Sequence, residues 1–64
     1  MKRAVIYFKD MTVDWVDPLH DEKKDIVYGK KYLTIDNGYH KYKYLLSKVK
    51  TISVTEVDEL SASK

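Results

Sequence analysis

The sequence predicts a small all-β protein. Three observations lead to this class: β-branched and aromatic residues dominate, apolar residues alternate instead of recurring at helical spacing, and only one proline and two glycines interrupt the chain. Five or six short strands within 64 residues imply an antiparallel meander or a partial barrel, SH3-like or OB-like. We expect a single β domain over residues 1–57 and a frayed tail over 58–64, with a short C-terminal helical turn left open.

The N-terminal stretch predicts a first hairpin with its turn at Lys9-Asp10, although Lys-Asp is a weaker turn sequence than Asn-Gly and a loop longer than two residues stays open. Pairing across this turn brings six apolar residues onto one face: Phe8 with Met11, Ile6 with Val13, and Ala4 with Trp15. The opposite face is mixed in polarity. We therefore expect the apolar face, including Trp15, to be buried.

The polar segment 17–25 contains the only proline and predicts a surface loop. A short strand over residues 25–28 should follow. Gly29-Lys30 then marks either a turn or a bulge.

Asn37-Gly38 predicts a second hairpin, because both central positions of a type I′ turn need a positive φ, which Asn and Gly tolerate best. A two-residue turn fixes the register and places Tyr32 opposite Lys43. The core face then collects Leu33, Ile35, Tyr42 and Tyr44. The outer face collects Tyr32, Thr34, Asp36, Tyr39, Lys41 and Lys43.

After a corner at 47–50, the stretch "TISV" predicts the last strand, with Ile52 and Val54 facing inward. The predicted core is Ala4, Ile6, Phe8, Val13, Trp15, Ile26, Leu33, Ile35, Tyr42, Ile52 and Val54.

Composition narrows the class of function. Without cysteine the chain has no disulfide and no thiolate zinc site, which favours a reducing, cytoplasmic setting. No apolar run approaches the roughly 20 residues of a membrane helix, and a net charge of +2 is far from the strongly basic balance of a duplex-DNA binder. Charge is unevenly distributed, since residues 10–25 are acidic and residues 30–50 are rich in lysine.

The sequence carries no enzyme motif: it has two histidines, no Gly-rich phosphate loop and no Gly-x-Ser-x-Gly turn. We expect neither catalysis nor a cofactor. Oxygen and imidazole groups do cluster in the acidic segment, but their spacing matches no ordered metal-binding loop, so we expect a solvated loop and no metal site. The cluster consists of Asp17, His20, Asp21, Glu22 and Asp25.

The sharpest candidate site is the outer face of the second hairpin, formed by Tyr32, Tyr39, Lys41 and Lys43. Aromatic rings beside lysines on a sheet can stack on bases while the ammonium groups hold phosphates. The same residues also suit an ordinary wet sheet face, in which lysine stems cover the rings, or a protein contact.

The ending "YKYLLSKVKTISV" resembles the close of small uncharacterised β-proteins carried by Gram-positive phages and other mobile elements. The likeness covers about the last half of the domain. It implies an accessory protein that binds and blocks a host or defence protein, and it assigns no functional residue.

Two functions follow from these observations. The first is a non-enzymatic binding protein that occupies the surface of a protein partner. The alternative is a binder of a nucleotide, cyclic nucleotide or single-stranded nucleic acid that uses the Tyr/Lys face. A thin core and open strand edges also predict a homodimer or a higher homo-oligomer.

Overall fold

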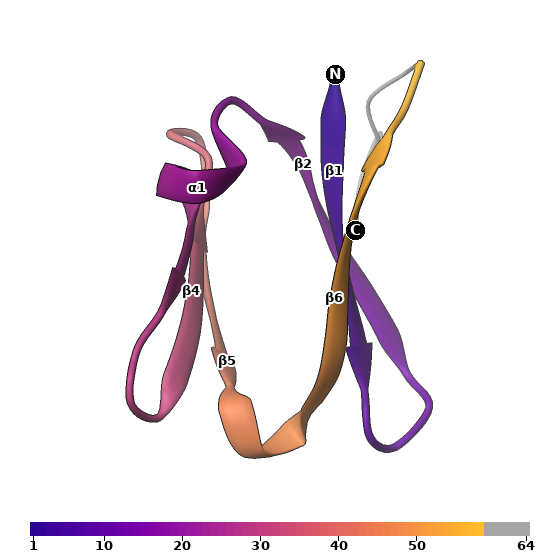
Figure 1. Cartoon of the computed structure of the whole chain (residues 1–64), viewed down its shortest axis with the longest axis vertical. Helices are drawn as coiled ribbons and strands as arrows, with labels where there is room; N and C mark the ends of the chain where they lie inside the picture. The colour runs from indigo at the N-terminus through magenta and orange to yellow at the C-terminus, as the bar shows by residue number, and fades with distance from the viewer. Residues whose placement is uncertain (59–64) are drawn as a thin grey trace.

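Six strands form two small antiparallel sheets that face each other (Figure 1). The computed structural model describes residues 1–58. The elements in chain order are β1 (Lys2–Phe8), β2 (Val13–Leu19), α1 (Glu22–Asp25), β3 (Ile26–Tyr28), β4 (Tyr32–Asp36), β5 (Lys41–Leu45), a 3-10 turn (Leu46–Lys48) and β6 (Val49–Glu56).

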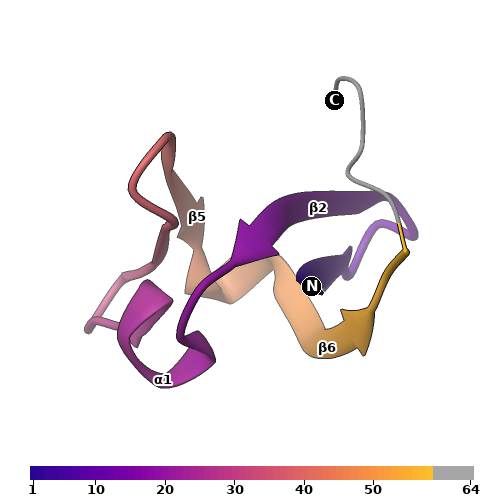
Figure 2. The same ribbon diagram turned by 90° about the horizontal axis from the view of Figure 1, so that it is seen from above.

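The two sheets differ in how they use the chain. One sheet has the strand order β2-β1-β6 and joins the N-terminal hairpin to the last strand, whereas the other, β3-β4-β5, is a contiguous meander. Seen from above, the two layers lie side by side, and the segment containing α1 connects them at one end (Figure 2). The 3-10 turn connects them at the other end.

The core lies between the layers and is small, as expected for a chain of this length. Six side chains are buried: Ala4, Ile6, Val16, Leu19, Leu33 and Ile35. Partly buried residues pack around them: Phe8, Ile26, Tyr42, Tyr44, Leu46, Val49, Ile52 and Val54. Nine of the eleven predicted core residues therefore contribute to this core, and Val13 and Trp15 do not.

The mostly β class is confirmed, as are the turn at Gly29-Lys30 and the inward facing of Ile52 and Val54. The strands do not close into a barrel. The narrower expectation of an SH3-like or OB-like fold stays a prediction, as does the domain boundary at residue 57. The expected C-terminal helical turn and most of the tail lie outside the described residues.

The predicted loop over 17–25 is wrong in part. Asp17, Pro18 and Leu19 continue β2, with a cis Asp17-Pro18 bond, and buried Leu19 anchors the strand end in the core. Residues 22–25 then form one helical turn, because the Asp21 side chain caps it by accepting a hydrogen bond from the Lys23 amide at 3.1 Å.

The register of the first hairpin is also wrong, by one residue. Ala4 lies opposite Val16 instead of Trp15. The Phe8 amide donates to the Thr12 carbonyl (2.9 Å), so the loop between them has three residues, Lys9 to Met11. The Met11 amide donates to the Phe8 carbonyl (3.1 Å), and Met11 itself adopts a φ of 75°. A turn followed by one left-handed residue is the usual three-residue hairpin loop.

The second hairpin is shifted by two residues from the predicted register. Tyr32 lies opposite Leu45, and Asp36 lies opposite Lys41. Gly38 has a φ of 89°, whereas Asn37 has no positive φ, so the turn is not the predicted type I′ turn. Because the shift is even, the predicted inner and outer faces of the two strands survive.

Candidate functional site

The predicted Tyr/Lys site is only partly assembled. Tyr32, Lys41 and Lys43 do share the outer face of sheet β3-β4-β5. Tyr39 instead lies in the β4–β5 loop, where its ring stands 5.8 Å from that of His20. Tyr32 is at the opposite end of the hairpin from this loop. The predicted two-residue turn would place Tyr39 opposite Asp36, and this is wrong because Asp36 lies opposite Lys41.

The outer face of sheet β3-β4-β5 is charged and wet. Asp36 lies opposite Lys41, Thr34 lies opposite Lys43, and Lys41 and Lys43 are exposed. We call this surface the charged face, and it consists of Val27, Tyr32, Thr34, Asp36, Lys41, Lys43 and Leu45. Asp36 partly offsets the two lysines, which weakens the field that would attract a phosphate.

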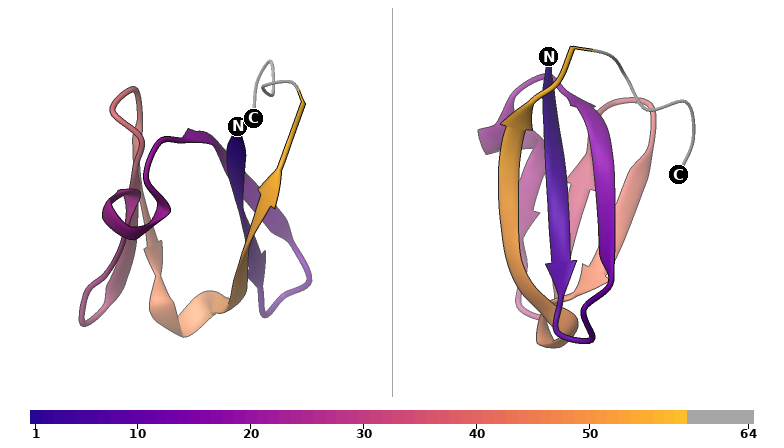
Figure 3. Two further views of the ribbon diagram at one scale, coloured as in Figure 1. Left: turned by 45° about the horizontal axis from the view of Figure 1, so that its top comes forward. Right: turned by 90° about the vertical axis from the view of Figure 1, so that its right-hand side faces the viewer.

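The outer face of sheet β2-β1-β6 has a different character. Val5 lies opposite Trp15 and Tyr7 lies opposite Val13, so four apolar or aromatic side chains form one block on the outside of the sheet. We call this block the apolar face. Figure 3 (right) views the molecule from the side of this sheet. The β6 residues that flank the block, Thr51 and Ser53, are uncharged.

One charged pair, Arg3 and Asp17, lies beside the apolar face. The Arg3 Nε donates to the Asp17 carboxylate at 2.7 Å, and the Arg3 guanidinium carbon stands 6.0 Å from the centre of the Trp15 ring. The ring and the carboxylate therefore hold Arg3 in place. Because the Asp17 side chain is only 6% exposed, little net charge reaches solvent here.

A hollow of about 210 Å³ lies at one end of the apolar face. It is lined by Tyr7, Phe8, Met11, Thr12, Val13 and Lys50. Met11 is 83% exposed at its rim, and Val13 is 49% exposed. A shallow recess with an apolar rim next to aromatic residues suits insertion of an apolar side chain from a partner protein.

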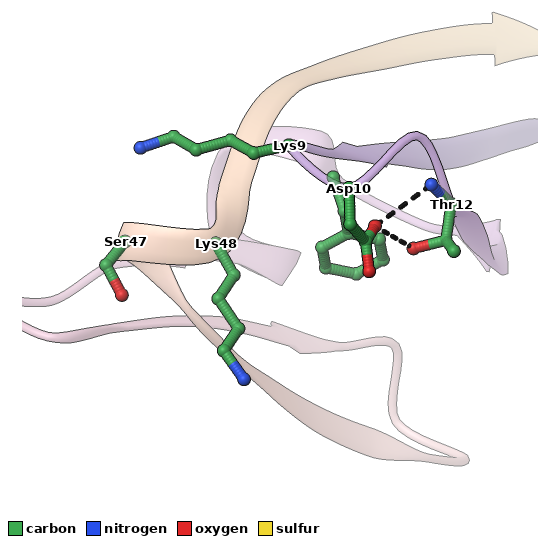
Figure 4. Close-up of a pocket in the computed structure, with 6 residues that line it drawn as sticks. Lys9, Asp10, Thr12, Ser47 and Lys48 are labelled. Carbon is green, nitrogen blue, oxygen red and sulfur yellow. Dashed lines mark hydrogen bonds between the residues drawn. The ribbon is translucent and has the colours of Figure 1, made fainter.

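A larger pocket of about 430 Å³ lies where the β1–β2 loop meets the 3-10 turn (Figure 4), and is lined by Phe8, Lys9, Asp10, Thr12, Ser47 and Lys48. The Lys9 amide donates to the Lys48 carbonyl at 2.9 Å and so joins the two segments. In Figure 4 the two lysine side chains extend in different directions and do not converge on one point. A strong anion site needs converging donors, which this arrangement does not supply.

Asp10 in this pocket serves the turn. Its carboxylate accepts hydrogen bonds from the hydroxyl and the amide of Thr12, the latter at 3.0 Å. These bonds, with a smaller effect of nearby Lys48, lower the pKa of the Asp10 carboxyl. The group stays ionised and holds the hairpin loop in shape.

The acidic residues of segment 17–25 also have structural roles. Asp25 accepts from the amides of His20 (2.8 Å) and Asp21 (3.3 Å), and Glu22 bonds the Lys2 ammonium at 3.1 Å. The latter contact raises the pKa of Lys2. Across residues 1–58, no three His, Asp or Glu side chains come together in a way that could hold a metal ion.

A hydrogen bond between two side chains links the sheets. The Tyr44 hydroxyl donates to the Asp14 carboxylate at 2.8 Å, which places a charged group of β2 on the inner side of its sheet. Burial, and then the hydrogen bond to Asp14, raise the pKa of the Tyr44 phenol. This bond links β2 to β5.

Sequence reasoning missed the apolar face because the one-residue register error turned Val13 and Trp15 inward. Strand β1 carried a signal for this face, because Val5 and Tyr7, which alternate with the buried Ala4 and Ile6, place two apolar or aromatic residues on the outer side of the sheet. Apolar residues that lie next to each other on the solvent side of a sheet indicate a contact surface.

Comparison with known proteins gives no relative from which to transfer a site. No family model, no curated protein and no solved structure matches the chain. In the described part of the chain, no helix is long and apolar enough to cross a bilayer.

Proposed function

We propose that this chain is a non-enzymatic binding protein that acts by occupying the surface of a protein partner, with the apolar face as its contact. The observation that carries the proposal is the block of Val5, Tyr7, Val13 and Trp15, which lies beside a recess and next to the paired Arg3 and Asp17. Interface centres are depleted of charge and enriched in Tyr, Trp, Met and Arg. The apolar face and its rim have this composition.

The same reasoning ranks the charged face lower. Lys41 lies opposite Asp36, Lys43 lies opposite Thr34, and Tyr39 lies in the β4–β5 loop and not on this face. A nucleotide or a single strand would meet one aromatic ring, Tyr32, where the sequence predicted two. This alternative therefore loses the stacking of successive bases that gives such sites their affinity.

The resemblance of the C-terminal half adds the biological setting to the proposal. The partner would be a host or defence protein that the chain blocks by covering it. The recess beside Tyr7 and Val13 suits a partner that presents a protruding apolar side chain.

A pair of matched valines tests the proposal. Val13 on the apolar face and Val27 on the charged face are similarly exposed, at 49% and 53%, and both lie in strands. A protein partner captured with the unaltered chain should bind Val13→Lys at least about tenfold more weakly, because a charge then enters the interface centre. Val27→Lys should bind it normally. Affinities are measured by calorimetry, and circular dichroism checks that both variants are folded.

Two results would contradict the proposal. Equal affinity of both variants would remove the apolar face from the interface. Loss of binding with Val27→Lys and with Lys43→Glu, together with a steep weakening by salt, would instead favour phosphate contacts on the charged face.

A further inference from the structure

The longest strand of the molecule, β6, lies at the edge of its sheet. Within residues 1–58, only β1 pairs with it, so the backbone groups along its other side are not used by the fold. An edge of this kind is a template for pairing with another strand.

The other three edges are less suited to pairing. β2 contains Pro18, which has no backbone N–H to donate, and β3 has only three residues. β5 has five residues and carries Lys41 and Lys43, which protect an edge by charge. β6 has eight residues, and its stretch from Thr51 to Thr55 is uncharged and rich in β-branched residues.

We propose that β6 pairs with β6 of a second copy of this chain, antiparallel and centred on Ser53. This register places Thr51 opposite Thr55 of the second copy and Ile52 opposite Val54 of the second copy. Each pair then joins residues of the same face, outer with outer and core with core. Lys50 comes to the level of Glu56 of the second copy, so opposite charges meet at both ends.

Neighbouring registers fit less well. A shift by one residue would place outer threonines opposite core residues. With Ile52 at the centre, Lys50 would lie opposite Val54, and with Val54 at the centre, Ile52 would lie opposite Glu56. Only the register centred on Ser53 satisfies both the faces and the charges.

The pairing also completes the core at its open side. Ile52 and Val54 pack on the core but are only partly buried. In the paired form, Ile52 and Val54 of the second copy would lie beside them and cover more of their surface. The two copies would share one six-stranded sheet, with both apolar faces on the same side, although the pairing does not depend on the proposed function.

The absence of cysteine from the chain allows a register-specific test. Directly opposite residues in antiparallel strands have Cα atoms about 4.5 to 5.5 Å apart, which a disulfide can span. Ser53→Cys should therefore form a disulfide-linked dimer under mild oxidation. Thr51→Cys and Thr55→Cys should each stay monomeric on a non-reducing gel, but an equal mixture of the two should form the linked heterodimer. Lys43→Cys, at the middle of the β5 edge, is the matched control and should not link.

Two solution measurements complete the test. Sedimentation equilibrium of the unaltered chain should give twice the chain mass of 7.6 kDa at micromolar concentrations. Ser53→Lys should halve that mass, because like charges would meet at the centre of the interface, and mixing it with Ser53→Glu should restore the dimer. A mass of 7.6 kDa at every concentration, or linking of Lys43→Cys as fast as Ser53→Cys, would overturn the pairing. A monomer that still bound a partner through Val13 would leave the proposed function intact.

Discussion

At the scale of single residues, Met11 determines the first hairpin. It adopts a positive φ of 75° in a loop that contains no glycine, although its side chain is 83% exposed. A left-handed conformation crowds the Cβ of every residue except glycine, so this position stores strain without a packing gain in return. A three-residue hairpin loop usually has glycine at its left-handed position. Because this loop contains no glycine, its sequence does not indicate a three-residue loop.

Replacing Met11 should therefore stabilise the protein. Met11→Gly relieves the Cβ crowding and should raise the free energy of unfolding by about 0.5 to 1 kcal/mol, after the greater flexibility of glycine in the unfolded chain is counted. Met11→Ala keeps the Cβ and is the control, with an expected change within about 0.5 kcal/mol. Urea denaturation measures both. A destabilised Met11→Gly would show that the side chain has a packing role that its exposure does not reveal.

At the scale of elements, the two hairpins show what a sequence can and cannot determine. Alternation of apolar residues located the strands and most of the core, because burial follows a period of two. The register of a hairpin depends on the length of its loop. One residue more or less in a loop hardly alters the sequence pattern, so the pattern does not determine the register. A one-residue error in the first hairpin assigned Val13 and Trp15 to the core, although they lie on the outer face. A two-residue error in the second hairpin left the faces of the β4 and β5 residues correct.

The same difference explains the outcome for the candidate site. Tyr32, Lys41 and Lys43 stayed on one face, but the added loop length carried Tyr39 away from them. The residue that shapes this loop, Asn37, combines bonds to the loop amides with a distant contact that no local pattern could predict. Asn37 is 2% exposed and donates from its side chain to the Asp17 carbonyl of β2 at 3.3 Å.

Asn37 should be the most sensitive residue of the second hairpin. Its side-chain oxygen accepts from the amides of Tyr39 (2.9 Å) and His40 (2.8 Å), so Asn37→Ala removes three hydrogen bonds from a buried position. We expect a loss of about 2 to 3 kcal/mol in the free energy of unfolding. Asp36→Ala, which removes one exposed bond to the Gly38 amide, should cost under about 1 kcal/mol. Similar losses in the two variants would show that the contact with Asp17 contributes nothing.

At the scale of the whole molecule, two thin sheets depend on each other. Each sheet packs only through its inner face, against the other sheet. Stability therefore comes from the six buried side chains between the sheets and from polar contacts that link them. The bond between Tyr44 and Asp14 is one such contact, and the ring of Tyr44 also stands 5.7 Å from that of Phe8.

Tyr44→Phe keeps the ring and removes the hydroxyl that donates to Asp14. It should lower the free energy of unfolding by about 1 to 2 kcal/mol at neutral pH. The raised pKa of the phenol means that folding favours its neutral form, so this contribution is complete below about pH 10 and is lost as the pH rises towards the pKa of the folded protein. In an absorbance titration of the six tyrosines, the last to ionise should be missing from the variant. If the phenol that the variant loses ionised in the same pH range as the other five, the bond would not be maintained in solution.

The arrangement of the two sheets along the chain has a kinetic consequence. The strands of sheet β3-β4-β5 are joined by short loops. The pairing of β1 with β6 instead joins residues that are far apart in sequence, such as Ile6 and Ile52. Ordering the intervening chain costs entropy before that pairing gains contacts. The meander should therefore form early and the β1–β6 pairing at or after the rate-limiting step. Conservative substitutions in β4 and β5 would then mainly slow folding, while those in β6 would mainly speed unfolding.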